Sequence, residues 1–317
     1  MTVGIAFEQY TIGDDVGCIL GEVAVTTGVG GSVTDAILAT GTPFWLLLTG
    51  STQGSGATQK NVSFAGSTMT WDGNGPSGTL VYGVMNPNFP APAAGTADFS
   101  VIYKTGKRLT RAMAQLCCVT VANITGTGAV QTLTISHPAG YPPVLAIHSL
   151  LGYTCVFNAA VGSTSTTYTF IAQAGTSIWY YVFTKVPDST PSGQGMRLFN
   201  DAGKVMFDSR YKMADIVATN LHYSTSDWAP PTNPSETLMY TGTSGRKYAA
   251  ITCDAGFSFY TPGPGPLTAD LSGVGTRNYA NELIYMKGLK YGGTPGVVGA
   301  FDTRVPATFA AIDVTGL

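Results

Sequence analysis

The feature of the sequence that most constrains its fold is an apolar, strand-like run that recurs twice. Residues 43–49 (PFWLLLT) are followed by residues 143–149 (PVLAIHS) at an offset of 100 residues, and by residues 247–253 (KYAAITC) at a further offset of 104. Self-similarity at a nearly fixed period indicates repeated structural units. The sequence therefore predicts three consecutive modules that share one architecture.

A second apolar run follows each of these at a constant spacing, in residues 80–85, 179–183 and 283–286. The separations are 37 residues from Trp45 to Tyr82, 36 from Leu145 to Tyr181, and 37 from Tyr248 to Tyr285. We therefore expect the three modules to superpose, with the first members of these pairs on equivalent strands.

Short runs of alternating apolar and polar residues, separated by glycine-containing turns, fill the space between these strands. Residues 61–66 (NVSFAG) and 67–72 (STMTWD) are examples. Such alternation is typical of strands with one buried face, and regularly spaced turns favour antiparallel sandwiches. The predicted fold class is all-β, with three tandem sandwich modules of about 100 residues each. Their predicted bounds are 1–88, 89–187 and 188–317, with linkers rich in proline and small residues at 86–95 and 187–195.

The chain is unusually poor in charge, because 11% of its residues are charged against about 25% in ordinary soluble proteins. Such a surface suits a protein that is packed against copies of itself or against neighbouring proteins. The alternative is a β surface rich in threonine, serine and asparagine, which stays soluble without charge. The net charge is −6 over residues 1–100, +6 over 101–212 and −2 over 213–317. This alternation favours contact between copies, but small counts of scattered charges give the same pattern.

No sequence window is long and apolar enough for a membrane-spanning helix, and the first fifteen residues lack the pattern of a signal peptide. We therefore expect a protein that is made in a cytoplasm and does not insert into membranes. The five cysteines are odd in number and form no CxxC pair, so they are interpreted as small buried hydrophobic residues. They are Cys18, Cys117, Cys118, Cys155 and Cys253.

Motifs that carry catalytic chemistry are missing from the sequence. The three histidines show no spacing typical of metal ligands, and there is no GxSxG elbow or P-loop. A glycosidase needs two carboxylates, and Asp14 with Asp15, Asp208 with Asp215, and Asp254 with Asp270 are the conceivable pairs. Chance gives such pairs in any chain of this size, so we expect no catalytic residues, no cofactor and no metal site.

Residues 195–212 (GMRLFNDAGKVMFDSRYK) predict a tight hairpin, because Asn200 and Asp201 favour a turn and Gly203 can adopt positive φ. We expect Leu198, Val205 and Phe207 to pack inward. A further expectation is that Asp208, Arg210 and Lys212 form ion pairs that orient the hairpin on the next element.

This hairpin resembles a motif of small tail-tip proteins of long-tailed bacteriophages, of the form G-L-x-V-aromatic-N-x-x-G-x-x-x-F-D-S-R-Y. Met196 stands in place of the usual leucine. The resemblance covers about eighteen residues and implies a component of the virion without naming a chemistry. The residues that carry it are Asn200, Gly203, Phe207, Asp208, Ser209, Arg210 and Tyr211.

Two loops of the third module have no counterpart in the other two, and they are rich in proline, glycine and aromatic residues. Surface loops on a rigid scaffold often carry recognition, so the candidate recognition residues are Trp228, Tyr260 and Tyr279. The alternative is that these residues only shape turns.

Together these features favour a non-enzymatic structural protein of a phage tail tip or baseplate, located in the virion tail and assembled in the host cytoplasm. The expected partners are copies of itself, as a trimer or else a hexamer, and other tail proteins. A host surface receptor or glycan is a further expected partner, and nucleic acid is not. The alternatives are a tail-associated polysaccharide or cell-wall hydrolase and a carbohydrate-binding module protein.

Overall fold

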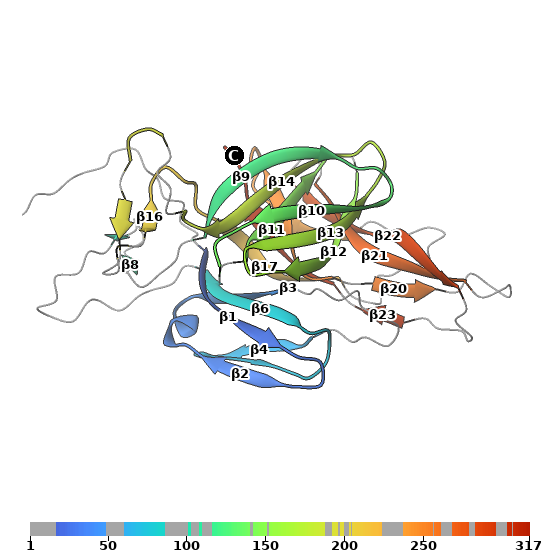
Figure 1. The fold of residues 1–317 in the computed structure, drawn as a ribbon, viewed down its shortest axis with the longest axis horizontal. Coiled ribbons are helices and arrows are strands. Elements are labelled where there is room, and N and C mark those ends of the chain that lie inside the picture. The colour runs from blue at the N-terminus through green and yellow to red at the C-terminus, as the bar shows by residue number, and fades with distance from the viewer. Residues whose placement is uncertain are drawn as a thin grey trace, which may run out of the picture.

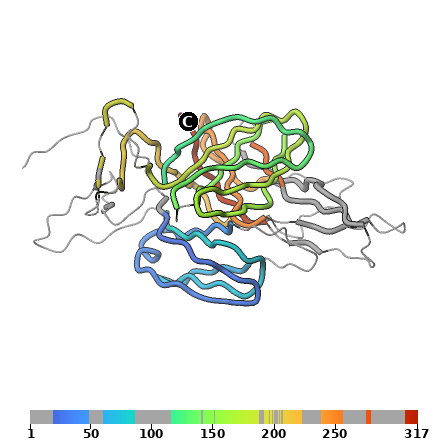
Figure 2. Tube along the Cα trace, viewed as in Figure 1, coloured from blue at the N-terminus to red at the C-terminus, as the bar shows by residue number. Residues whose placement is uncertain are grey.

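A computed structural model describes most of the chain (Figures 1 and 2). The residues that it describes are 17–48, 60–85, 101–102, 108–109, 116–139, 142–150, 152–187, 192–195, 197–199, 203, 205–223, 237–255, 257–260, 268–278, 283–295, 303–305 and 307–317. The fold is all-β and antiparallel, as predicted, with 24 strands and one short 3-10 helix in these residues. Within them, no helix has the length and apolarity that a membrane span requires.

Most of the strands fall into three groups that correspond to the three expected modules and are called repeats 1, 2 and 3 below. Repeat 1 consists of six strands in two three-stranded sheets, with the orders β1-β6-β3 and β2-β5-β4. The 3-10 helix, Ala36–Thr40, begins at Asp35, whose carboxylate accepts a hydrogen bond from the Ile37 amide. The strands are β1 (Gly17–Val25), β2 (Gly31–Thr34), β3 (Thr42–Leu48), β4 (Val62–Ala65), β5 (Thr68–Trp71) and β6 (Gly78–Met85).

Repeat 2 has the same pairing order as repeat 1, because its strands form the sequences β9-β14-β11 and β10-β13-β12 within larger sheets. The position of each strand in the chain order therefore determines its neighbours in the same way in both repeats. The strands are β9 (Leu116–Thr125), β10 (Val130–Ser136), β11 (Val144–Ser149), β12 (Thr154–Val161), β13 (Ser165–Ala172) and β14 (Ser177–Lys185).

Repeat 3 follows the same order with two additional strands, as β17-β24-β19 in one sheet and β18-β22-β21 in the other. Strands β20 and β23 extend the second sheet beyond β21. The strands are β17 (Asp215–Tyr223), β18 (Thr237–Thr241), β19 (Tyr248–Asp254), β20 (Phe257–Tyr260), β21 (Thr268–Asn278), β22 (Leu283–Pro295), β23 (Thr303–Val305) and β24 (Ala307–Asp313).

The predicted equivalence of strands agrees with the pairing order for the first strand of each pair and is wrong for one second strand. That the three modules superpose stays a prediction. Trp45, Leu145 and Tyr248 lie on β3, β11 and β19, which occupy equivalent places. Residues 283–286 lie on β22, however, whereas the equivalent of β6 and β14 is β24. The added strands lengthen repeat 3 and shift its last strand along the chain.

Repeats 2 and 3 are not separate sandwiches, because they share both sheets. Ala146 on β11 pairs with Ile251 on β19, which joins their first sheets into the order β17-β24-β19-β11-β14-β9. Thr154 on β12 pairs with Thr276 on β21 and joins the second sheets. In Figure 2 repeat 1 forms a lobe beside this larger body. The predicted bounds of the three modules stay a prediction.

Buried Asn278 fastens the joint between β11 and β19. Its side-chain oxygen accepts a hydrogen bond from the Ser149 amide at 3.2 Å, and its Nδ2 donates to the Tyr248 carbonyl at 2.5 Å. Only 1% of Asn278 is exposed, so these bonds satisfy polar groups that water cannot reach.

Strand β3 is buried on both faces, which explains its uninterrupted apolar sequence. Trp45 and Leu47 face the core between the two sheets of repeat 1. Phe44, Leu46 and Leu48 belong instead to a cluster that contains residues of all three repeats. This shared core includes Val81 of β6, Leu145, Ala146 and Phe183 of repeat 2, and Ile251 and Ile312 of repeat 3.

Candidate functional site: the arginine-bracketed hairpin

The predicted hairpin is present as strands β15 (Arg197–Phe199) and β16 (Val205–Asp208), which lie apart from the large sheets in Figure 1. The strands are antiparallel, with Arg197 opposite Asp208, and Gly203 in the connection has a φ of 72°. The predicted turn glycine is therefore confirmed. Two short strands, β7 (Val101–Ile102) and β8 (Arg108–Leu109), form a separate pair.

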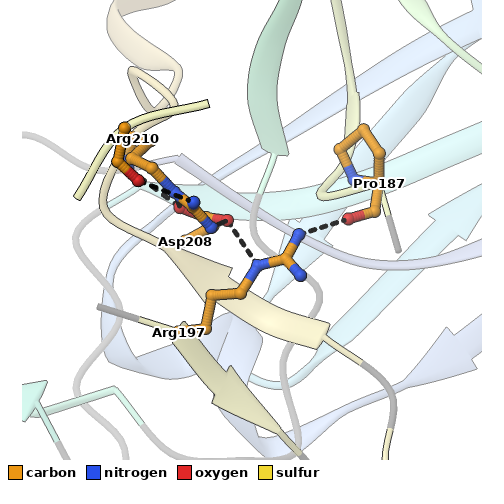
Figure 3. A network of polar contacts seen from close by, with 5 residues as sticks. Pro187, Arg197, Asp208 and Arg210 are labelled. Atoms are coloured by element: carbon orange, nitrogen blue, oxygen red, sulfur yellow. Dashed lines mark hydrogen bonds and ion pairs between the residues drawn. The ribbon is translucent and has the colours of Figure 1, made fainter. Parts of the chain in front are cut away.

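Asp208 is buried between two arginines (Figure 3). Arg197 donates from Nε to Oδ2 of Asp208 at 2.6 Å. Arg210 donates from Nε to Oδ1 at 2.8 Å and from Nη2 to Oδ2 at 2.6 Å, which is a bidentate pair. The Asp208 side chain is 0% exposed, and the two arginine side chains are 13% and 12% exposed. The carboxylate therefore binds both arginines at once, and part of each arginine side chain remains at the surface.

The same arginines hold the segment that precedes the hairpin. Arg210 donates from Nη1 to the Gly193 carbonyl at 3.2 Å, and Arg197 donates from Nη2 to the Pro187 carbonyl at 3.5 Å. A Cβ atom at Gly195 would lie 2.6 Å from Cγ of Arg210, so only glycine leaves room for this side chain. The two arginines that bind the Asp208 carboxylate thus also hold the chain where it enters the hairpin.

Apolar contacts attach the hairpin to the large sheet. Val205 is 2% exposed and packs with Cys117 of β9 and Val186, while Phe207 is 6% exposed. These two predicted inward positions are confirmed; the side chain of Leu198 lies outside the described residues. Beyond the hairpin, the Lys212 carbonyl accepts from the Cys118 amide and the Ala214 amide donates to the Leu116 carbonyl, both at 2.8 Å.

Electrostatics make Asp208 an anchor rather than an acid. Burial raises its pKa, but the hydrogen bonds from Arg210 and Arg197 outweigh burial and lower the pKa to about 2. The group is therefore ionised throughout the physiological range and has no proton to donate. The arrangement is suited to fixing a shape and not to general acid catalysis.

Acidification is expected to loosen the hairpin as the pH falls from about 4 to about 2. The pKa of Asp208 is about 2 in the folded chain, below its ordinary value of 3.8. The unfolded chain therefore binds the proton first, and the stability from this carboxylate is present above pH 4 and lost below it. The NMR signals of the Arg197 and Arg210 Nε–H groups report the loss. The Asp208→Asn variant should show no such transition, and the same transition in that variant would contradict the assignment to Asp208.

Sequence reasoning identified Asp208 and Arg210 but missed Arg197. The signal for it was the hairpin register, which places Arg197 directly opposite Asp208. The Nζ of Lys212 donates to the Thr315 carbonyl, and the ion pair expected of Lys212 stays a prediction. The contact with Thr315 also attaches the hairpin to the end of the chain.

The remaining predicted residues are only partly described. Ser209 and Tyr211 are half-buried, and Tyr211 packs near Val205. Asn200, Trp228 and Tyr279 lie outside the described residues, and Tyr260 is on β20 without a described side chain. The candidate recognition loops thus stay a prediction.

The cysteines and, besides Asp208, one of the carboxylates suggested for a hydrolase are buried in the described part of the chain. Burial raises the pKa of Cys117 and Cys155 to about 12 and that of Cys118 to about 11, which keeps these thiols protonated. Asp254 is 1% exposed, and neither Asp14 with Asp15 nor the side chain of Asp270 is described. No cluster of metal-ligating side chains occurs among the described residues.

No protein-family model matches the chain, and neither the curated proteins nor the solved structures gave a match.

Proposed function

We propose that the protein is a non-enzymatic structural component of the tail tip or baseplate of a long-tailed bacteriophage. The observation that carries this proposal is the hairpin that resembles a tail-tip motif, together with its construction. Its aspartate and arginine, Asp208 and Arg210, form a buried clamp with Arg197. A motif used in this way specifies the shape of a projecting hairpin, and a fixed shape is what a docking element in an assembly needs.

The hairpin presents an apolar side chain for such docking, since Phe199, on the same strand as Arg197, is 48% exposed. Aromatic side chains often anchor protein interfaces. We propose that Phe199 and the turn contact a neighbouring virion protein or a second copy of the chain. The clamp then holds the contact in position without taking part in it.

The surface chemistry supports assembly with other proteins. Only 11% of the residues are charged, and large apolar residues are exposed on several elements. We propose a closed homo-oligomer, a trimer with a hexamer as the alternative, because closed rings avoid open-ended association. The exposed large apolar residues of the described chain are Val29, Val121, Val130, Leu150, Trp179, Phe199 and Leu238.

Localisation in the particle tests the proposal. Antibodies against the purified chain, bound to gold, should label one end of the tail in phage particles that encode it. Particles grown with a stop codon early in the gene should lose the label and show a defective tail tip. A protein that is abundant in the lysate but missing from purified particles would contradict the proposal. Release of reducing sugars from cell-wall polysaccharide by the purified chain would favour the hydrolase instead.

A further inference from the structure

Trp179 is the one large aromatic side chain of β14 that is exposed, at 45%, although most of this strand is buried. In the sheet it lies between Asn123 of β9 and His148 of β11, which are its direct partners on either side. Directly opposite residues of antiparallel strands share a face. The indole ring therefore lies in the middle of a row that runs across three strands (β9, β14 and β11 in Figure 1).

The neighbouring row on the same face is polar. Ser177 pairs with Thr125, and both are exposed. Asn123 is also exposed, and its Nδ2 donates to the Ser177 hydroxyl at 2.8 Å. We name Trp179, Asn123, Ser177, Thr125 and His148 together the Trp179 platform.

The platform carries no formal charge. There is no charged residue between Val119 and Thr125, between Val144 and Ser149, or between Ser177 and Phe183. The charged group that acts on the platform is Lys247, which precedes β19 on the other side of β11 from β14 and adds to the lowering of the His148 pKa. Nδ1 of His148 lies 2.8 Å from the Tyr248 carbonyl, and because a carbonyl only accepts, this nitrogen carries the hydrogen. Burial lowers the pKa of His148, which keeps the ring neutral at pH 7 with Nε2 as an acceptor.

The structure assigns to the Trp179 platform the binding of a neutral glycan, through a pyranose ring that stacks on the indole. One face of a pyranose is formed by C–H groups and is flat, like the exposed indole, while its hydroxyls project outward at the edge. Amide, hydroxyl and imidazole groups around the indole can donate to and accept from those hydroxyls. These direct neighbours of the indole are uncharged and offer partners for hydroxyls but no ion pair, which favours an uncharged glycan.

The size of the platform argues against a second protein chain as its occupant. Farther along the same face, Tyr181 and Phe183 are 3% and 0% exposed. The exposed large apolar residues on or next to these three strands are Trp179, its neighbour Val121 at 38%, and Leu150 directly after β11 at 43%. A stable protein interface needs about 800 Å² from each partner, whereas a sugar ring needs little more than the indole.

This inference deepens the proposed function. The source of the glycan, a bacterial surface, rests on the proposed function. The assignment of glycan binding to the platform is independent of it. Recognition would then lie on repeat 2, in addition to the loops of repeat 3 suggested by the sequence.

Titration calorimetry of the full chain with a panel of neutral hexose and N-acetylhexosamine oligosaccharides tests the platform. Binding by the unaltered chain should weaken about tenfold or more in Trp179→Ala, because an aromatic anchor is lost. Leu238→Ala removes a large apolar residue that is equally exposed, at 49%, on β18 of repeat 3, and should bind like the unaltered chain. Asn123→Ala should weaken binding less than Trp179→Ala, and all three variants should keep the melting temperature.

Two results would overturn the assignment. One is that no oligosaccharide of the panel binds, and the other is that Trp179→Ala binds as well as Leu238→Ala does. Either result leaves the tail localisation standing if the gold label is found there. Conversely, glycan binding by a chain that is missing from the particles would reject the proposed function and keep the platform.

Discussion

Replacing Phe44 with alanine is expected to lower the free energy of unfolding by about 3–5 kcal/mol. Phe44 is 1% exposed and belongs to the core shared by all three repeats. Its removal deletes a large apolar side chain and leaves a cavity that strands from several sheets would have to move to fill. Several of the surrounding strands, among them β6, β11, β14 and β24, have a ladder on each side, so little of the lost contact can be recovered. Denaturation with urea, followed by tryptophan fluorescence, measures the change.

The control is Leu238→Ala, which truncates an apolar side chain that is 49% exposed on β18. Its effect should stay within about 0.5 kcal/mol. If Phe44→Ala costs as little as this control, repeat 1 does not depend on the shared core. A separate early transition in Phe44→Ala would show that its main effect is to detach repeat 1.

Replacing Asp208 with alanine is expected to speed the hydrogen exchange of the β15 and β16 amides about a hundredfold, which corresponds to roughly 3 kcal/mol of local stability. The substitution removes the only carboxylate that the structure shows between Arg197 and Arg210 among the described residues. Two cations would then face each other, and the donors that point at the carboxylate would lose that acceptor. Hydrogen–deuterium exchange with mass spectrometry resolves the hairpin from the large sheets.

Arg246→Ala is the control for this experiment. Arg246 pairs with Asp313 at 2.6 Å, but its side chain is 54% exposed, and exposed pairs contribute about 0–1 kcal/mol. Exchange in the hairpin should be unchanged in this variant. Unchanged exchange in Asp208→Ala would show that apolar contacts of Val205 and Phe207 hold the hairpin without the clamp.

Much of the fold could be predicted from the sequence because its strands follow simple periodicity. The alternation in the short strands and the continuous apolar runs such as 44–48 report which faces are buried. The prediction of buried cysteines is confirmed for Cys117, Cys118, Cys155 and Cys253; the side chain of Cys18 is not described. Turn chemistry predicted the positive φ of Gly203 in the same local way.

Interactions between repeats could not be predicted, because they depend on strand neighbours far apart in the chain. Nothing in residues 144–149 or 248–254 shows that these two strands pair with each other. The apolar run at 283–286 kept the expected spacing, yet it belongs to β22 because β20 and β23 are inserted into repeat 3. Spacing alone cannot distinguish an equivalent strand from its neighbour.

In the candidate site, too, contacts between residues close in the sequence could be predicted, and contacts between distant residues could not. Asp208 and Arg210 are two residues apart, so their pairing could be proposed from local sequence. Arg197 is placed next to them only by the hairpin register. The Nζ of Lys212 donates to the carbonyl of Thr315, which is more than one hundred residues away in the sequence. The Trp179 platform needed three strands in register before its residues could be seen as one surface.

The pairing of β11 with β19 has a consequence for synthesis on the ribosome. Ala146 leaves the ribosome well before its partner Ile251, and at about 5–20 residues per second this interval lasts roughly 5–20 s. During that time repeat 2 can complete its internal ladders, but the outer edge of β11 has no neighbour. Nascent chains on adjacent ribosomes of one messenger present the same apolar edge to each other. The tempo of translation through repeat 3 therefore sets how long the growing chain is open to mispairing with its own copies.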